Sequence, residues 1–296
     1  MSADDVAGWG PLAEPYHSDK EIPPGSPPWR ENVFLAFFDR ERDVYGTSHF
    51  TGASNAGGRR ARLSVVVGGT AAEIVEPMAA GEFGTPGVQL DLSGQVRAKS
   101  DDLAAELSFV PRLPPVDYSA SNTLPGLDDT EPLRHYQGSG TFTGTVAVHG
   151  AAPVVVAGGC LRDRTWGWRE ENRHWLEYYA CFLCFEDFDL TLMKFRLADG
   201  STRAHGATVG GRAERVTGSR VARNGWGSVT RFDVELDGRP PIELAVAPPE
   251  ARIWLPLGEP DGAQALTAYD EFVEARTPDG LTGFGIVEQG ILRQLA

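Results

Sequence analysis

The stretch Gly158-Gly159-Cys160-Leu161-Arg162-Asp163-Arg164-Thr165-Trp166-Gly167-Trp168-Arg169 lies near the middle of a chain of 296 residues. Its last eight residues hold three arginines, one aspartate and two tryptophans. An aspartate between two arginines forms a charge-assisted cluster, which fixes geometry more than it adds stability. Indole rings supply flat apolar walls, each with one N–H donor. The composition of the stretch therefore predicts the floor of a pocket.

The whole chain is acidic and has a length that suits one large or two medium domains. A formal net charge of −14 argues against nucleic acid and anionic membrane surfaces as partners. The N-terminus is acidic and lacks an apolar signal-peptide core, and no apolar run approaches the ~20 residues of a membrane span. Three cysteines do not make a disulfide framework. We therefore expect a soluble, cytoplasmic protein.

Both halves of the chain read as β-structure. Apolar and aromatic runs at 29–39 and 175–185 indicate buried strands. Cys181 and Cys184 lie within the second run, so we interpret them as residues of a buried strand and not as a zinc or redox site. No apolar pattern with a helical period exceeds two turns. Many short strands with Gly-rich turns predict an all-β barrel or sandwich architecture. We expect a proline-rich extended lead-in over 1–28, a first barrel over 29–150 and a second over 151–296.

The central stretch admits two interpretations. If it is extended, Arg162, Arg164, Trp166 and Trp168 share one face, while Asp163, Thr165 and Arg169 share the other. An inward aspartate in apolar surroundings can serve as a general acid. The alternative is a structural Arg–Asp clamp that joins the two halves of the chain.

Several nucleotide, metal and nucleophile signatures are missing from the sequence. There is no phosphate-binding loop, no dinucleotide fingerprint and no G-x-S-x-G elbow, and the six histidines form no metal-binding spacing. We therefore expect neither a cofactor nor a metal. The remaining chemistry is acid–base, electrostatic and shape-based.

A family resemblance rests on residues 159–169. They resemble the motif of the lipocalin-like superfamily of carotenoid 1,2-hydratases (hydroxyneurosporene synthases) and AttH-like proteins, in an uncharacterised bacterial branch. His135–Gly144 and Gly283–Gly290 are also similar to that branch. The resemblance implies two consecutive lipocalin-like antiparallel β-barrels. Asp163 matches the acidic position of the motif and Trp166 its tryptophan.

The resemblance also implies a range of activities. The hydratases add water to an alkene, and structurally similar proteins are pericyclases that fold a polyene. This sequence carries Arg164 where several relatives have histidine. Arginine does not relay a proton at neutral pH, so the hydratase mechanism does not transfer whole.

Together these observations predict a cofactor-independent enzyme. Its substrate would be a hydrophobic small molecule such as a terpenoid, polyene, polyketide or aromatic compound. The step would be of the lyase (hydratase) or cyclase/isomerase type. A non-catalytic carrier of a hydrophobic ligand is the alternative, and the oligomeric state stays open. The expected catalytic residues are Asp163, Arg164 and Arg162. The expected substrate-binding residues are Trp166, Trp168, Arg169, Trp175, Tyr178, Tyr179, His205, Tyr269 and Glu288.

Overall fold

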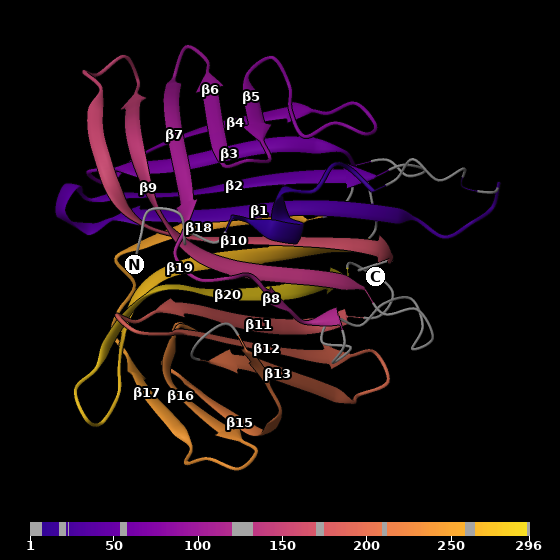
Figure 1. The fold of residues 1–296 in the computed structure, drawn as a ribbon, viewed down its shortest axis with the longest axis vertical. Helices are drawn as coiled ribbons and strands as arrows, with labels where there is room; N and C mark the ends of the chain where they lie inside the picture. Colours follow the sequence, from indigo (N-terminus) through magenta and orange to yellow (C-terminus); the bar gives the residue numbers. More distant parts are fainter. Residues whose placement is uncertain are drawn as a thin grey trace. The chain divides into compact units, whose positions relative to one another are not determined.

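The computed structural model describes residues 8–17, 22, 24–53, 58–119, 133–169, 175–208, 212–257 and 264–294. These residues form two curled antiparallel sheets of ten strands each (Figure 1). The helical segments among them are two short 3-10 helices, Gly10–Ala13 and Arg40–Arg42. The prediction of two consecutive lipocalin-like β-barrels is confirmed.

The first sheet holds the N-terminal strands and the central stretch. Its strands follow the order β4-β3-β2-β1-β10-β9-β7-β6-β5, and β8 pairs with β9. Alternate residues of each strand point inward, so that Leu35, Phe37, Phe50 and Phe142 share one buried core. The strand bounds are β1 (Trp29–Asp39), β2 (Val44–Ala53), β3 (Arg60–Val67), β4 (Thr70–Pro77), β5 (Val88–Asp91), β6 (Gln95–Lys99), β7 (Leu103–Pro111), β8 (Val116–Asp117), β9 (Arg134–Val148) and β10 (Val154–Trp168).

The second sheet has the order β14-β13-β12-β11-β20-β19-β17-β16-β15, and β18 pairs with β19. Its own core gathers Cys181, Leu192, Phe232 and Val287. The strand bounds are β11 (Trp175–Cys184), β12 (Asp189–Leu197), β13 (Thr202–Thr208), β14 (Arg212–Glu214), β15 (Val216–Arg223), β16 (Val229–Leu236), β17 (Ile242–Val246), β18 (Ala251–Leu257), β19 (Gln264–Arg276) and β20 (Thr282–Gln294).

The two sheets share one topology. Adding ten to each strand number of the first sheet gives the strand order of the second, including the side pairing of β8 with β9 and of β18 with β19. The sequences Trp29-Arg30-Glu31 of β1 and Trp175-Leu176-Glu177 of β11 match at the corresponding place. This match lets each position of one sheet be compared with its counterpart in the other.

The structure differs from the expected boundary at residue 151. β10 pairs with β1 and β9 and therefore belongs to the first sheet. His149 and Gly150 have φ of 48° and 71°, so they form a tight turn between two neighbouring strands of one sheet. The described residues divide into two compact units after Arg169.

The N-terminal segment also differs from an extended lead-in. Residues 10–13 form a 3-10 helix, and Trp9 and Leu12 are buried in the core of the first barrel. The indole of Trp9 donates to the carbonyl of Phe109 at 3.2 Å. Burial of these two apolar side chains holds the N-terminal segment against the barrel, although its prolines and glycines predicted an extended chain.

Candidate functional site

Strand β10 separates the residues of the central stretch between its two faces. Arg162 and Arg164 point into the first barrel, where both are enclosed. Asp163 and Thr165 lie on the opposite face, as the alternation of a strand requires. The arginines and the aspartate therefore do not share one site.

Arg164 is bound to Glu31 and to the N-terminal segment. Its Nε donates to Glu31 Oε1 at 2.8 Å, and its Nη2 pairs with the same oxygen. Further N–H groups donate to the carbonyl oxygens of Leu12, Glu14 and Pro15. The carboxylate partner of Arg164 is thus Glu31, which the sequence analysis did not single out.

Arg162 holds the same segment from beside Arg164. It donates to the carbonyls of Leu12 at 2.6 Å and Leu92 at 2.9 Å, and its guanidinium lies over the Trp9 ring. Burial and the charge of Arg164 lower the pKa of Arg162 to about 9. Both arginines therefore position residues 9–17 across the first barrel, and a catalytic role for them stays a prediction.

His17 completes this cluster. Its Nδ1 lies 2.7 Å from Glu31 and its Nε2 lies 2.9 Å from Glu14, while its ring stacks on Trp166 at 4.0 Å. Burial opposes protonation, but the hydrogen bonds to Glu31 and Glu14 raise the pKa of His17 above its usual value. Tyr136 also stacks on Trp166, at 5.4 Å. Trp166 is therefore a packed residue on the arginine side of β10 and does not line the face of Asp163.

The opposite face of β1, β2, β9 and β10 is polar and largely buried. In register, Asp163 lies between Phe34 and Gln137, and Thr165 lies between Asn32 and His135. Asp163 is partly exposed, whereas His135, Gln137 and Ser139 are buried. We call this surface the polar face; its members are Asn32, Thr47, His49, Thr51, His135, Gln137, Ser139, Asp163 and Thr165.

The two histidines of the polar face are neutral at physiological pH. Burial, followed by the charge of Arg169, lowers the pKa of His135 and of His49 to about 3. His135 Nδ1 lies 2.6 Å from Thr165 Oγ1. Among the described residues, His135 Nε2, Ser139 Oγ and Thr47 Oγ1 are buried without a hydrogen-bond partner. The polar face therefore presents hydrogen-bonding atoms that the described part of the protein does not use.

Glu288 occupies the position of Asp163 in the second sheet. Asp163 is in register with Phe34, which follows Glu31 by three residues. Glu288 is in register with Ala180, which follows Glu177 by three residues. The sequence predicts Glu288 as a substrate-binding residue. In the structure it pairs with Tyr178, whose hydroxyl donates to Glu288 Oε1.

Asp270 is the second partner of Glu288. The two residues face each other in the register of β19 and β20, and the carboxyl group of Asp270 lowers the pKa of Glu288. Burial raises the pKa of Glu288, and the interactions with Tyr178 and Asp270, which both lower this pKa, only partly offset the effect of burial. Two carboxyl groups in contact retain a shared proton more readily than one alone. Asp270 lies next to Tyr269 and was missed because its pairing depends on strand register.

The surroundings of Glu288 are aromatic. Trp175, Tyr178 and Phe195 contact one another with ring centroids 5.0 to 5.8 Å apart. The structure thus brings three of the predicted residues together, Trp175, Tyr178 and Glu288, on one face of the second sheet.

The remaining predicted residues lie elsewhere. Tyr179 points into the second core, where burial raises its pKa to about 12. Trp168 packs edge-on against Trp29 at 5.1 Å. Arg169 is buried beside the polar face, and its Nη2 donates to the side-chain oxygen of Asn32 when the Asn32 amide is turned so that this oxygen faces Arg169. Tyr269 is in register with Trp254 on β18. His205 lies on β13, and its side chain is outside the described residues.

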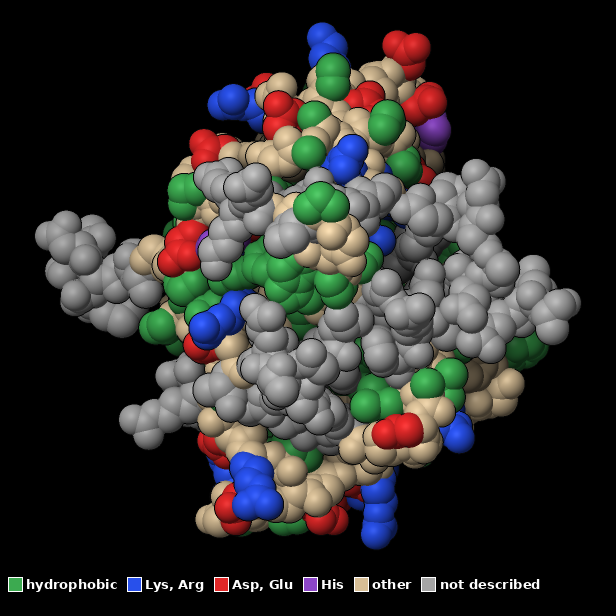
Figure 2. Space-filling model, turned by 90° about the vertical axis from the view of Figure 1, so that its right-hand side faces the viewer, with side chains coloured by type: hydrophobic (Ala, Val, Ile, Leu, Met, Phe, Trp, Pro, Cys, Tyr) green, Lys and Arg blue, Asp and Glu red, His purple; other side chains and the backbone are tan. Residues whose placement is uncertain are grey.

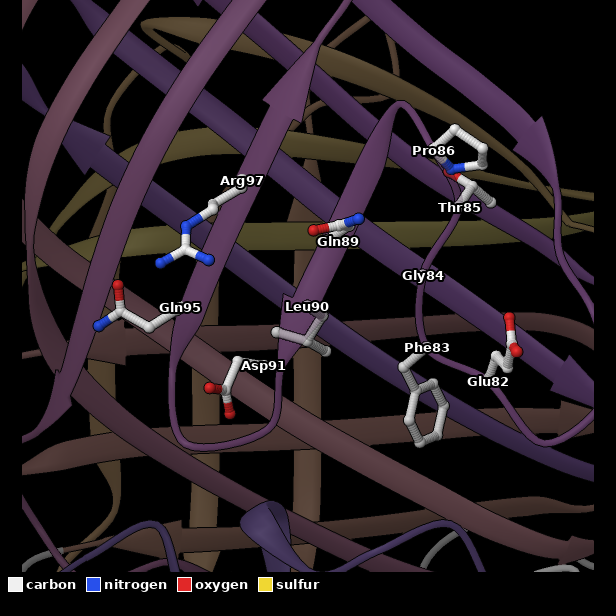
Figure 3. A pocket seen from close by; sticks show the side chains of 10 residues that line it. All are labelled: Glu82, Phe83, Gly84, Thr85, Pro86, Gln89, Leu90, Asp91, Gln95 and Arg97. Atoms are coloured by element: carbon white, nitrogen blue, oxygen red, sulfur yellow. The ribbon is translucent and has the colours of Figure 1, made fainter.

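An open pocket of about 580 Å³ lies on the first unit, and its residue Phe83 contacts the guanidinium of Arg164. Figure 3 shows Phe83 and Thr85 of the preceding loop beside Leu90 of β5 and Arg97 of β6. A neighbouring hollow of about 380 Å³ shares Pro86, Gln89 and Arg97 with it. None of the predicted site residues lines either pocket. On the face drawn in Figure 2, acidic and basic side chains of the described residues are interspersed.

In the described part of the chain, no group of three His, Cys, Asp or Glu side chains could hold a metal ion, and Cys160, Cys181 and Cys184 form no disulfide. No described helix has the length and apolarity needed to cross a membrane.

Comparisons with known proteins identify the fold. A family model described as "Domain of unknown function (DUF7064)" matches residues 16–291. No curated protein matches the sequence. A putative AttH from Nitrosomonas europaea has a similar structure, with a TM-score of 0.63 and 16% identity over 93% of this chain and 98% of that one.

Two further structures share the fold. CghA in complex with Sch210972 has a TM-score of 0.62 and 13% identity, over 90% of this chain and 89% of that one. Kievitone hydratase from Nectria haematococca has a TM-score of 0.59 and 12% identity, over 99% of this chain and 95% of that one. The resemblance to AttH-like proteins is thereby confirmed at the level of the fold.

Proposed function

This chain belongs to the DUF7064 family, and from that premise we propose that it is a cofactor-independent enzyme acting on a hydrophobic small molecule. The reaction is a lyase (hydratase) or cyclase/isomerase step. One structure with this fold is a hydratase, and another holds the small molecule Sch210972. The proposal assigns the chemistry to an acid on a barrel face.

The observation that carries the proposal is the position of Asp163 in the polar face. Asp163 is the partly exposed acid in a surface whose neighbours Thr165, His135 and Gln137 are buried. A carboxyl group that is reachable from one side and surrounded by fixed hydrogen-bonding groups suits proton transfer to a bound molecule. The two histidines stay neutral, so Asp163 is the group of this face that exchanges a proton.

The chemistry balances without an oxidant or reductant. In hydration, the carboxylic acid gives its proton to one alkene carbon, which forms a C–H bond and leaves a cation on the other carbon. Water then forms the C–O bond, and its surplus proton returns to the carboxylate. Elimination of water is the same sequence in reverse, and cyclisation replaces water by a second double bond of the substrate. Asp163 supplies and recovers the proton in each case.

Glu288 is the second candidate acid, in the other unit. Burial raises its pKa, which is the direction that favours a proton donor, and Trp175, Tyr178 and Phe195 form an aromatic surface beside it. The two acids are therefore tested separately, by the variants Asp163→Asn and Glu288→Gln.

The test uses kievitone and Sch210972 as first probes. Purified protein is incubated with each compound, and mass spectrometry follows gain or loss of one water and any isomer formed. Asp163→Asn is expected to keep the fold and abolish turnover, while the exposed control Glu106→Gln keeps it. Full turnover by folded Asp163→Asn contradicts the role of Asp163. Tight binding with every compound recovered unchanged supports a carrier instead.

A further inference from the structure

We propose that the polar face of the first unit binds oxygen atoms of the ligand, so that the substrate is a hydrophobic molecule bearing hydroxyl or carbonyl groups and is not a pure hydrocarbon. Calling this ligand a substrate rests on the proposed function; the binding of its oxygen atoms does not. The proposal concerns His135 and Ser139 of β9, which lie two residues to either side of the position in register with Asp163 and whose atoms Nε2 and Oγ are buried.

The first argument is the state of these atoms. The exposed fraction is 3% for His135 and 1% for Ser139. His135 Nε2 and Ser139 Oγ have no hydrogen-bond partner among the described residues. A buried polar atom without a partner destabilises the folded state, so native proteins provide one from protein, water or ligand. Two such atoms on one strand face point to a molecule that supplies the partners.

The second argument comes from the equivalent positions of the second sheet. The register that matches Asp163 to Glu288 also matches His135 to Ala268 and Ser139 to Phe272. On the strand beyond, His49 corresponds to Met193 and Thr51 to Phe195. The same topology therefore forms with apolar residues at these places. The barrel does not need His135 or Ser139, which leaves recognition as their role.

The third argument fixes the chemistry of the ligand. His135 Nδ1 is engaged by Thr165, and the ring is neutral, so Nε2 offers either one proton or one lone pair. A hydroxyl group suits both tautomers, and a carbonyl oxygen suits the Nε2–H tautomer. The Ser139 hydroxyl likewise donates or accepts. A hydrocarbon offers neither, and it leaves both atoms unpaired when it excludes water.

The spacing of the two residues gives the size of the ligand. His135 and Ser139 are four residues apart on one strand, which is roughly 13 Å at the rise of a β-strand. Gln137 lies between them on the same face. A ligand that reaches both residues is elongated and carries oxygen at two separated places. A smaller oxygenated molecule engages one of them.

The experiment measures binding of matched pairs in which a hydroxyl replaces a methyl group. Isothermal titration of the full chain uses 2-naphthol against 2-methylnaphthalene, and 4-hydroxybiphenyl against 4-methylbiphenyl. We expect the hydroxyl member of a pair to bind about tenfold tighter. Because each of these compounds carries one hydroxyl group, we expect one of the two variants, His135→Leu or Ser139→Ala, to remove that preference. Thr143→Ala, an exposed position further along β9, leaves it unchanged.

Three outcomes overturn the proposal: equal affinity within both pairs, no binding of either hydroxyl compound, or a preference that survives both variants. A separate measurement, of the melting temperature, needs no ligand. Ser139→Ala removes an unpaired hydroxyl, so the ligand-free variant is expected to melt about 2 °C higher, and a lower Tm contradicts the proposal. Preference for oxygen without turnover of any compound leaves this inference standing while the proposed enzyme function fails.

Discussion

Glu31 and Arg164 form an ion pair whose two side chains are fully enclosed in the first barrel. The pair is supplemented by His17 and by three backbone carbonyls of the N-terminal segment. An enclosed charge pair adds little net stability, but loss of one partner leaves the other charge without compensation. The fold of residues 9–17 therefore depends on Glu31.

Glu31→Gln is expected to destabilise the first unit by about 3–5 kcal/mol, because Arg164 stays buried without its counter-charge. Urea unfolding followed by tryptophan fluorescence measures the change. The exposed Glu41, 3.9 Å from Arg42, is the control, and Glu41→Gln should change stability by no more than about 0.5 kcal/mol. Equal effects of the two variants would show that the enclosed pair has no special role.

Leu12→Ala tests the anchoring of the N-terminal segment. Leu12 has no exposed surface, and its carbonyl accepts from both Arg162 and Arg164. The lost packing and the cavity should cost about 2–5 kcal/mol. Val155→Ala, at an exposed position of β10, serves as the matched control and should cost far less. A small loss for Leu12→Ala in denaturant titration would mean that the segment is not part of the barrel core.

His17 makes the stability of the first unit depend on pH. Its folded-state pKa lies above 6.5, because Glu31 and Glu14 favour the protonated ring. The stabilisation is therefore complete below pH 6.5 and is lost as pH rises through the folded-state pKa. His17→Ala should remove this part of the pH dependence. Stability that increases across the same pH range because of His17 would contradict the assigned contacts.

Glu288 should give the second unit a pH dependence with the same sign. Its pKa is raised in the folded state, mainly by burial, so the native state retains a proton that the unfolded state releases. Stability then falls as pH rises from about 4.5 through the folded-state pKa. Glu288→Gln should flatten this slope, as measured by denaturant titrations at a series of pH values. An unchanged slope would assign the proton to another group.

Much of the fold was readable from local pattern. The aromatic run at 29–39 is β1 with the same bounds, and the alternation over Arg162, Asp163 and Arg164 gives the correct two faces of β10. β18 was not predicted, since Pro256 interrupts an otherwise apolar run. The boundary after Arg169 was not predicted either, because His149-Gly150 reads equally as a hairpin or as the end of a domain.

The site was less predictable, because its partners are distant in sequence. Glu31 and His17 carry no local signal that links them to Arg164. Asp270 becomes a partner of Glu288 only through the register of β19 and β20. The sequence predicts Asp163 and Thr165 on one face of an extended strand, but the neighbour His135 follows only from the pairing of β9 with β10.

The pairing of β1 with β10 and of β11 with β20 has a consequence for synthesis. In each sheet the first strand to leave the ribosome pairs with the last strand of its unit. Until β10 emerges, the nascent first barrel keeps β1 and β9 as open edges, which invite association with other chains. Such long-range pairing is slow to form, so the first barrel closes late in its own translation, while the second is still being made. A chain that ends before β20 repeats that exposure permanently at β11 and β19.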